Sequence, residues 1–110
     1  MFARALKSGV IIANGSDVGV FTHGKNAREL ELMVAYGMSA RAALRAATAT
    51  AAAVLRRDKE LGRLAPGYLA DLVAVRGNPL EDVAVLEKPV VVVKGGQVAV
   101  APAAPAPPVP

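Results

Sequence analysis

The stretch Gly9-Val10-Ile11-Ile12-Ala13-Asn14-Gly15-Ser16-Asp17 decides the fold of this 110-residue chain. Its short run of apolar, largely β-branched residues lies between two glycines, which predicts a strand over 10–14 that is buried on both faces. Such strands are typical of parallel sheets that helices cover on both sides. The strand ends at a glycine and is followed by a carboxylate. The pattern therefore places one acid, Asp17, at the end of a strand in an α/β fold.

Helical spacing of the apolar residues predicts two helices after this strand, over 26–36 and 39–57. Asn26 is a good N-cap, and Glu29 three residues later suits a reciprocal capping arrangement. Ser39 is the expected N-cap of the second helix. The loop between strand and first helix, residues 15–25, is rich in glycine.

The first residues predict a further short helix over 2–7, which Ser8-Gly9 ends. A helix of about six residues is marginal in water by itself. We therefore expect the chain to be a fragment that begins within an element of a longer protein.

After Gly62 the sequence changes from a helical to an extended pattern. Pro66-Gly67 predicts a tight turn, and Gly95-Gly96 between two β-rich runs predicts a hairpin. The expected strands cover 69–75, 89–94 and 97–100. Residues 101–110 are rich in proline and alanine and carry no charge, so we expect a disordered tail.

The composition of the chain argues against several classes of function. The chain has a net charge of +4, no cysteine and one histidine, which excludes disulfides and thiolate chemistry and suits a cytoplasmic location. No apolar run approaches the ~20 residues that span a bilayer, and no signal peptide is evident. The basic group at 56–59 is expected to be a solvated helix end rather than a nucleic-acid site, because aromatic stacking partners are missing.

Residue types alone leave several roles open for Asp17 and His23. Asp17 can cap a turn, with His23 a surface loop residue. A Ser-His-Asp hydrolase using Ser16 is disfavoured, because Ser16 and Asp17 are adjacent and no nucleophile elbow surrounds them. The glycines match no phosphate-binding loop. In a metal site Asp17 would supply one oxygen, but a catalytic zinc takes about three protein ligands, and the single histidine cannot complete that set.

The order and spacing of several segments together resemble the C-terminal part of metal-dependent amidohydrolases, in the imidazolonepropionase-like or Xaa-Pro dipeptidase-like branch. The segments that carry the resemblance are 12–20, 23–24, 26–34, 37–39, 42–48, 61–64, 66–67, 69–73 and 93–96.

The resemblance implies a TIM-like (β/α)₈ barrel followed by a small β section that is part of a composite β-sandwich. Residues 1–60 would form the C-terminal end of the barrel, 61–100 a segment of the sandwich, and 101–110 the tail. Asp17 would end the last barrel strand, binding a divalent metal, expected to be zinc, and acting as general base. His23 would face the substrate, and Asp71 would be structural.

The family's other metal ligands have no counterpart in this sequence, because they belong to barrel strands that the chain lacks. The implied reaction of the full-length family is hydrolysis of a carbon–nitrogen bond in a small cyclic amide or dipeptide-like substrate. We expect the chain alone to be inactive and to bind no metal tightly. Expected partners are itself or the missing barrel part, with no nucleic acid and no membrane. The alternative is a non-catalytic protein-binding module derived from the hydrolase.

Overall fold

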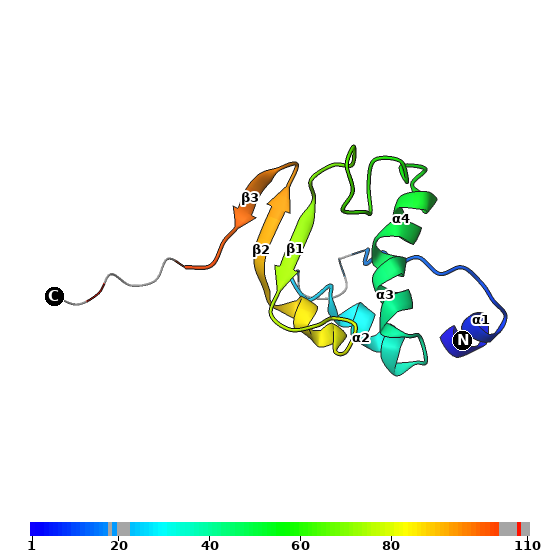
Figure 1. The fold of residues 1–110 in the computed structure, drawn as a ribbon. Helices are drawn as coiled ribbons and strands as arrows, with labels where there is room; N and C mark the ends of the chain where they lie inside the picture. The colour runs from blue at the N-terminus through cyan, green and yellow to red at the C-terminus, as the bar shows by residue number, and fades with distance from the viewer. Residues whose placement is uncertain (18, 20–22, 104–107, 109–110) are drawn as a thin grey trace.

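The computed structural model describes residues 1–17, 19, 23–103 and 108. Helices form one side of the molecule and a three-stranded sheet the other (Figure 1). The helices are α1 (Phe2–Lys7), α2 (Arg28–Ala35), α3 (Ala40–Ala47) and α4 (Ala49–Val54), with a 3₁₀ helix η1 (Val83–Glu87). The strands are β1 (Leu72–Val75), β2 (Pro89–Lys94) and β3 (Gln97–Val100).

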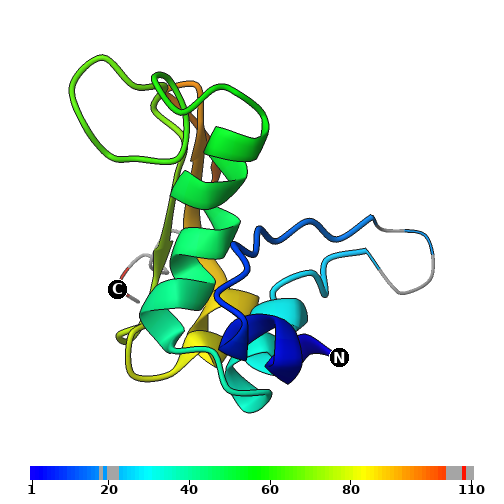
Figure 2. The ribbon, with the colours of Figure 1, turned by 90° about the vertical axis from the view of Figure 1, so that its right-hand side faces the viewer.

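The core lies where α2 and α3 meet. Its buried side chains are Leu30, Met33, Met38, Ala43 and Ala46. Partly buried residues of α1 and η1 pack against this cluster: Phe2, Leu6 and Leu86. The core is small because α3 contributes alanines, which bury little area per residue. Figure 2 shows α1 and α2 beside the lower end of α3.

Two predicted helix ends are confirmed by their caps. Ser39 caps α3, because its hydroxyl accepts a hydrogen bond from the Ala42 amide at 3.1 Å. Gly37 follows α2 with φ +111°, a conformation that glycine adopts without strain.

The single helix predicted over 39–57 is wrong, since it is interrupted at Thr48 and ends at Val54. Thr48 has φ −124° and ψ −94°, and its hydroxyl donates to the Leu44 carbonyl at 2.7 Å. Such back-bonding from threonine bends helices. The sequence pattern shows the continuous apolar side of both helices but not this break.

The strand predicted over 10–14 does not form, because no neighbouring strand among the described residues pairs with it. Among the described residues, the Val10 amide donates to the nearby Ala5 carbonyl at 3.2 Å, and the Asn14 amide donates to the Ala46 carbonyl of α3 at 2.9 Å. Val10 is 56% and Ile11 84% exposed. The first two residues of this apolar segment therefore lie at the surface, whereas Ile12 packs against the core.

The predicted β section is confirmed, as an antiparallel sheet in the order β1-β2-β3. β2 and β3 have the predicted bounds, and Gly95 (φ +57°) and Gly96 (φ +80°) both have the positive φ that a type I′ hairpin turn requires. β1 is shorter than the predicted 69–75. The turn at Pro66-Gly67 is also confirmed, with the Tyr68 amide bonded to the Ala65 carbonyl at 3.1 Å.

No helix in the described part of the chain is long and apolar enough to cross a membrane. The cytoplasmic location stays a prediction. Most of the tail predicted to be disordered, residues 104–107 and 109–110, lies outside the described residues, as do residues 18 and 20–22 of the loop between Gly15 and Lys25.

Candidate functional site

Asp17, the acid that the sequence singles out, lies on an unusual backbone. Its φ is +44°, in the left-handed region that residues other than glycine seldom adopt, although aspartate tolerates it better than most. The residue is exposed. It follows Gly15 and Ser16, neither of which forms a hydrogen bond to another described residue. The structure thus presents the carboxylate at the surface, in a conformation that has to be held in place.

His23 lies beyond the residues of the loop that the structure does not describe, and it is exposed. No hydrogen bond between described residues joins its ring to Asp17. The role of His23 toward a substrate therefore stays a prediction.

A divalent metal does not fit the described residues by themselves. Within them, no three or more side chains of histidine, cysteine, aspartate or glutamate come together in a way that could hold an ion. Asp17 offers one exposed carboxylate, whereas a catalytic zinc takes about three protein ligands. Any metal bound through Asp17 would need ligands from outside this set.

Asn14 ties the segment before Asp17 to α2. Its side-chain amide donates to Glu29 Oε2 at 2.8 Å and points toward the Met33 sulfur at 3.9 Å. The predicted capping pair of Asn26 and Glu29 is therefore wrong. Helix α2 begins at Arg28, and its N-cap makes no side-chain hydrogen bond. The Glu29 carboxylate faces Asn14 instead, a long-range contact that helical spacing does not reveal.

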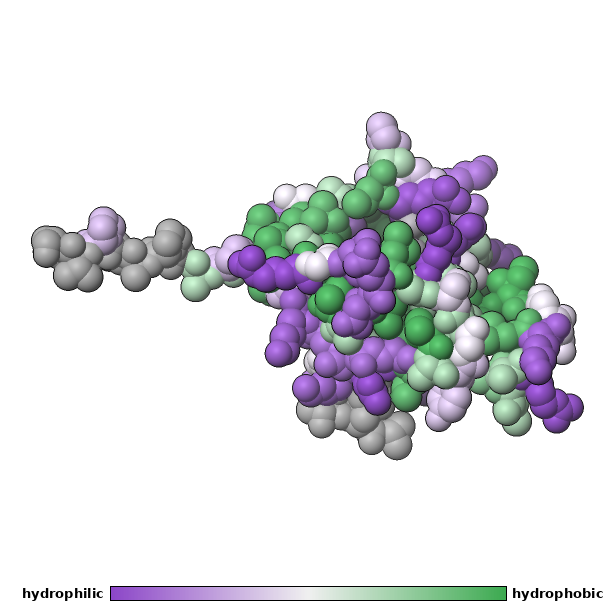
Figure 3. Space-filling model, turned by 60° about the horizontal axis from the view of Figure 1, so that its bottom comes forward, coloured by the Kyte–Doolittle hydropathy of each residue, from purple (hydrophilic) through white to green (hydrophobic). Residues whose placement is uncertain are grey.

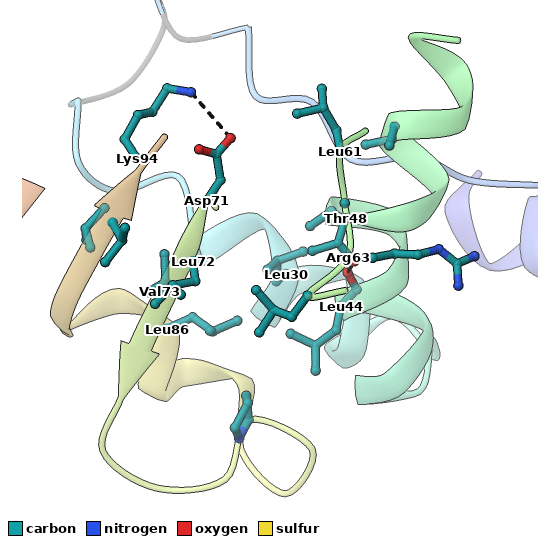
Figure 4. A pocket seen from close by; sticks show the side chains of 18 of the residues that line it. Leu30, Leu44, Thr48, Leu61, Arg63, Asp71, Leu72, Val73, Leu86 and Lys94 are labelled. Atoms are coloured by element: carbon teal, nitrogen blue, oxygen red, sulfur yellow. Dashed lines mark hydrogen bonds and ion pairs between the residues drawn. The ribbon is translucent and has the colours of Figure 1, made fainter. Parts of the chain in front are cut away.

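An apolar cleft of about 750 Å³ separates the helices from the sheet. Figure 4 shows leucines from both sides pointing into it, Leu72 and Leu86 on the sheet side and Leu30 and Leu44 on the helix side. The remaining lining residues are Ala47, Thr48, Ala51, Ala52, Leu55, Leu61, Gly62, Arg63, Leu64, Asp71, Val73, Val75, Pro79, Val92, Val93 and Lys94. Sequence periodicity marks most of these side chains as apolar but does not show the cleft that lies between them.

Apolar side chains are also visible on the outer surface. Figure 3 shows them in several groups between hydrophilic ones. Large exposed examples are Ile11 at 84%, Leu64 at 77% and Leu55 at 65% of full exposure. Leu55 and Leu64 also line the apolar cleft, so part of this exposed apolar surface is continuous with it.

Asp71, at the edge of the cleft, holds the hairpin turn. Its carboxylate accepts a hydrogen bond from the Gly95 amide at 2.7 Å, and its other oxygen lies 3.4 Å from the Lys94 ammonium. The Gly95 bond is the main cause of a lowered pKa of Asp71, and Lys94 lowers it further, while partial desolvation acts in the opposite direction. These contacts agree with the structural role expected from the sequence.

Comparison with known proteins gives consistent matches. The sequence pattern of the Amidohydrolase family matches residues 1–99. Ochratoxinase from Aspergillus niger is 40% identical over 101 residues, which are 87% of this chain and 21% of that protein. The crystal structure of a Xaa-Pro dipeptidase superposes with a TM-score of 0.88 at 46% identity, covering 91% of this chain and 25% of the other. The crystal structure of the A. niger ochratoxinase gives a TM-score of 0.79 at 36% identity. The chain thus spans about a quarter or less of the length of these relatives.

Proposed function

Since this chain belongs to the amidohydrolase family, we propose that it is the C-terminal part of a metal-dependent hydrolase of carbon–nitrogen bonds. Residues 1–60 would complete the barrel and 61–100 would form one part of the β-sandwich. The extent of the family match and the quarter of the Xaa-Pro dipeptidase that is covered support this assignment. The name of that relative favours a small dipeptide-like substrate over a cyclic amide.

The observation that carries the proposal is the backbone of Asp17. A residue held at φ +44° on an exposed segment is of the kind that clusters at functional sites, where the surroundings pay for the strain. In the complete enzyme the Asp17 carboxylate would accept a proton from the water that attacks the scissile carbonyl. The same carboxylate would be one ligand of a divalent metal, for which we propose zinc. His23 would contact the substrate.

The partner of the chain would be the rest of the barrel. Two features support this: Val10 and Ile11 are exposed and pair with no strand among the described residues, and the apolar cleft of about 750 Å³ is open. Each is a surface that a longer polypeptide would cover. By itself the chain would bind no metal tightly and would show no hydrolase activity.

A chimera tests the role of Asp17. Residues 1–99 would replace the matching quarter of the Xaa-Pro dipeptidase, whose fold superposes with a TM-score of 0.88. We expect the chimera to hydrolyse a Xaa-Pro dipeptide and Asp17→Asn to lower kcat by about 10²–10⁴-fold, the usual contribution of a general base. The isolated 110-residue chain would serve as a control without turnover. A folded, metal-loaded chimera that keeps its kcat after Asp17→Asn would refute the role.

The second candidate function, a non-catalytic protein-binding module, is favoured by the same open cleft. Size-exclusion chromatography and metal analysis of the purified chain separate the two. Stoichiometric, tightly bound zinc would contradict the binding module. A metal-free chain that forms a stable complex with the remaining three quarters of the dipeptidase, without restoring turnover, would favour it over the hydrolase.

A further inference from the structure

Asn14 is the last residue before Asp17 that is anchored to the helices. Its side-chain amide donates to Glu29 Oε2 on α2 at 2.8 Å, and its backbone amide donates to the Ala46 carbonyl on α3 at 2.9 Å. Two helices thus hold one residue through two different groups. We propose that Asn14 and Glu29 form a positioning pair that directs the Asp17 carboxylate toward its place in the active site.

The pair can influence the position of Asp17 because Asn14 and Asp17 are close together in the sequence. Asp17 lies three residues after Asn14, and three residues reach at most about 10 Å when fully extended. Gly15 and Ser16 make no hydrogen bond to other described residues, and an added Cβ at Gly15 would meet nothing within 4 Å. Asn14 is therefore the nearest anchored residue on the N-terminal side of Asp17, and its position limits where Asp17 can lie.

The use of Glu29 argues for a dedicated contact. Glu29 lies in the first turn of α2, where its charge suits the helix dipole. It forms no capping bond, and its carboxylate is directed to Asn14. A hydrogen bond from an amide to a carboxylate is shorter and stronger than one between neutral groups. The Glu29 carboxylate thus gives the segment that carries Asp17 a charged hydrogen-bond acceptor on α2.

The pair also lies apart from the proposed chemistry. Asn14 and Glu29 are half-buried, whereas Asp17 is exposed. Neither residue is assigned to the metal or the substrate. The pair would therefore act through Asp17 alone, and this last step rests on the proposed function. The anchor itself does not depend on it.

The anchor is tested in the 110-residue chain by amide hydrogen exchange. Asn14→Ala removes the side-chain donor, and we expect exchange at the amide of residue 14, which is bonded to Ala46, to speed up at least tenfold. Asn14→Asp sets two carboxylates against each other and should do more. The double variant Asn14→Asp/Glu29→Gln restores the hydrogen bond with donor and acceptor exchanged, so protection should return. Asn26→Ala is the matched control, because the Asn26 side chain bonds to no described residue.

The effect on Asp17 is tested in the dipeptidase chimera. Loss of a group that orients a ligand residue typically costs about 10–100-fold in activity or metal affinity. We expect Asn14→Ala to lower kcat by that factor with little change in KM, Asn26→Ala to leave kcat unchanged, and the exchanged pair to recover most of it.

The outcomes separate the two hypotheses. If Asp17→Asn abolishes turnover while Asn14→Ala leaves kcat unchanged, the positioning role is refuted and the proposed function stands. If Asp17→Asn has no effect, the proposed function fails, and the hydrogen-exchange result alone decides the anchor. The positioning role is also refuted if the Asn14→Asp/Glu29→Gln variant restores neither the protection of the amide of residue 14 nor the kcat of the chimera.

Discussion

Replacing Gly62 with alanine is expected to destabilise the chain by about 2–5 kcal/mol. Gly62 has φ +85°, and the left-handed conformation costs a residue with a side chain about 1–2 kcal/mol. The added Cβ would also lie 2.8 Å from the Thr48 carbonyl oxygen and 3.0 Å from the Ala52 Cβ. Both neighbours belong to the helical layer and cannot swing aside, so overpacking adds about 1–3 kcal/mol.

Gly67 supplies a matched control. Its φ of +87° is nearly the same, but an added Cβ there would meet nothing within 4 Å. Gly67→Ala therefore carries only the conformational cost of about 1–2 kcal/mol. The loss of unfolded-state entropy from glycine to alanine is common to both variants and cancels in the comparison. The difference between the two measures the contact of Gly62 with the break between α3 and α4.

Urea unfolding followed by far-ultraviolet circular dichroism gives this difference. With a slope of about 1–3 kcal/mol per molar urea, the midpoint of Gly62→Ala should lie about 1 M below that of Gly67→Ala. Equal midpoints would refute the reasoning, because they would show that the close approach of residue 62 to Thr48 does not change the free energy of unfolding when a Cβ is added. A lower midpoint for Gly67→Ala would refute it as well.

Two further substitutions test local contacts. The pKa of Asp71 is lowered in the folded chain, chiefly by the Gly95 amide, so its stabilising effect is present above the unfolded pKa of about 4 and is lost as the pH falls through the lower folded value. Asp71→Asn should weaken this acid dependence of the urea midpoint, whereas an unchanged dependence would contradict the assignment. Ser39→Ala should lower the free energy of unfolding by about 1 kcal/mol through the lost helix cap. Asn26→Ala should leave the urea midpoint unchanged. Equal losses of stability in both variants would argue against the capping assignment.

The parts of the fold that could be predicted are those with local causes. The hairpin of β2 and β3 has the bounds that the sequence predicts, because the two glycines between them determine the turn and the pairing next to it, although the register shifts between Val92 and Val93. The Ser39 cap and the Pro66-Gly67 turn likewise depend on a few consecutive residues. Features of this kind can be predicted from the sequence because they do not depend on contacts with distant residues.

The parts that could not be predicted depend on distant contacts. The segment 10–14 has the composition of a buried strand, but a strand forms only where others pair with it. The Glu29 carboxylate turns to a residue 15 positions away rather than to its own helix. The break at Thr48 coincides with the close approach of Gly62. At the candidate site, sequence singles out Asp17 but gives no sign of the anchor at Asn14.

The isolation of Asp17 and the exposed apolar surfaces have a common physical explanation in the proposed enzyme. Within the described residues, the Asp17 carboxylate has no group of further metal ligands beside it, Val10 and Ile11 are exposed, and an apolar cleft lies open. Apolar surface would supply the free energy of association with the rest of the barrel, since it is the largest favourable term in burial. Asp17 contributes nothing to that term, because it is exposed and makes no packing contact in the core. Different residues of this chain would therefore drive assembly with the rest of the barrel and take part in the chemistry. The described segment around Asn14 links the Asp17 carboxylate to the helices.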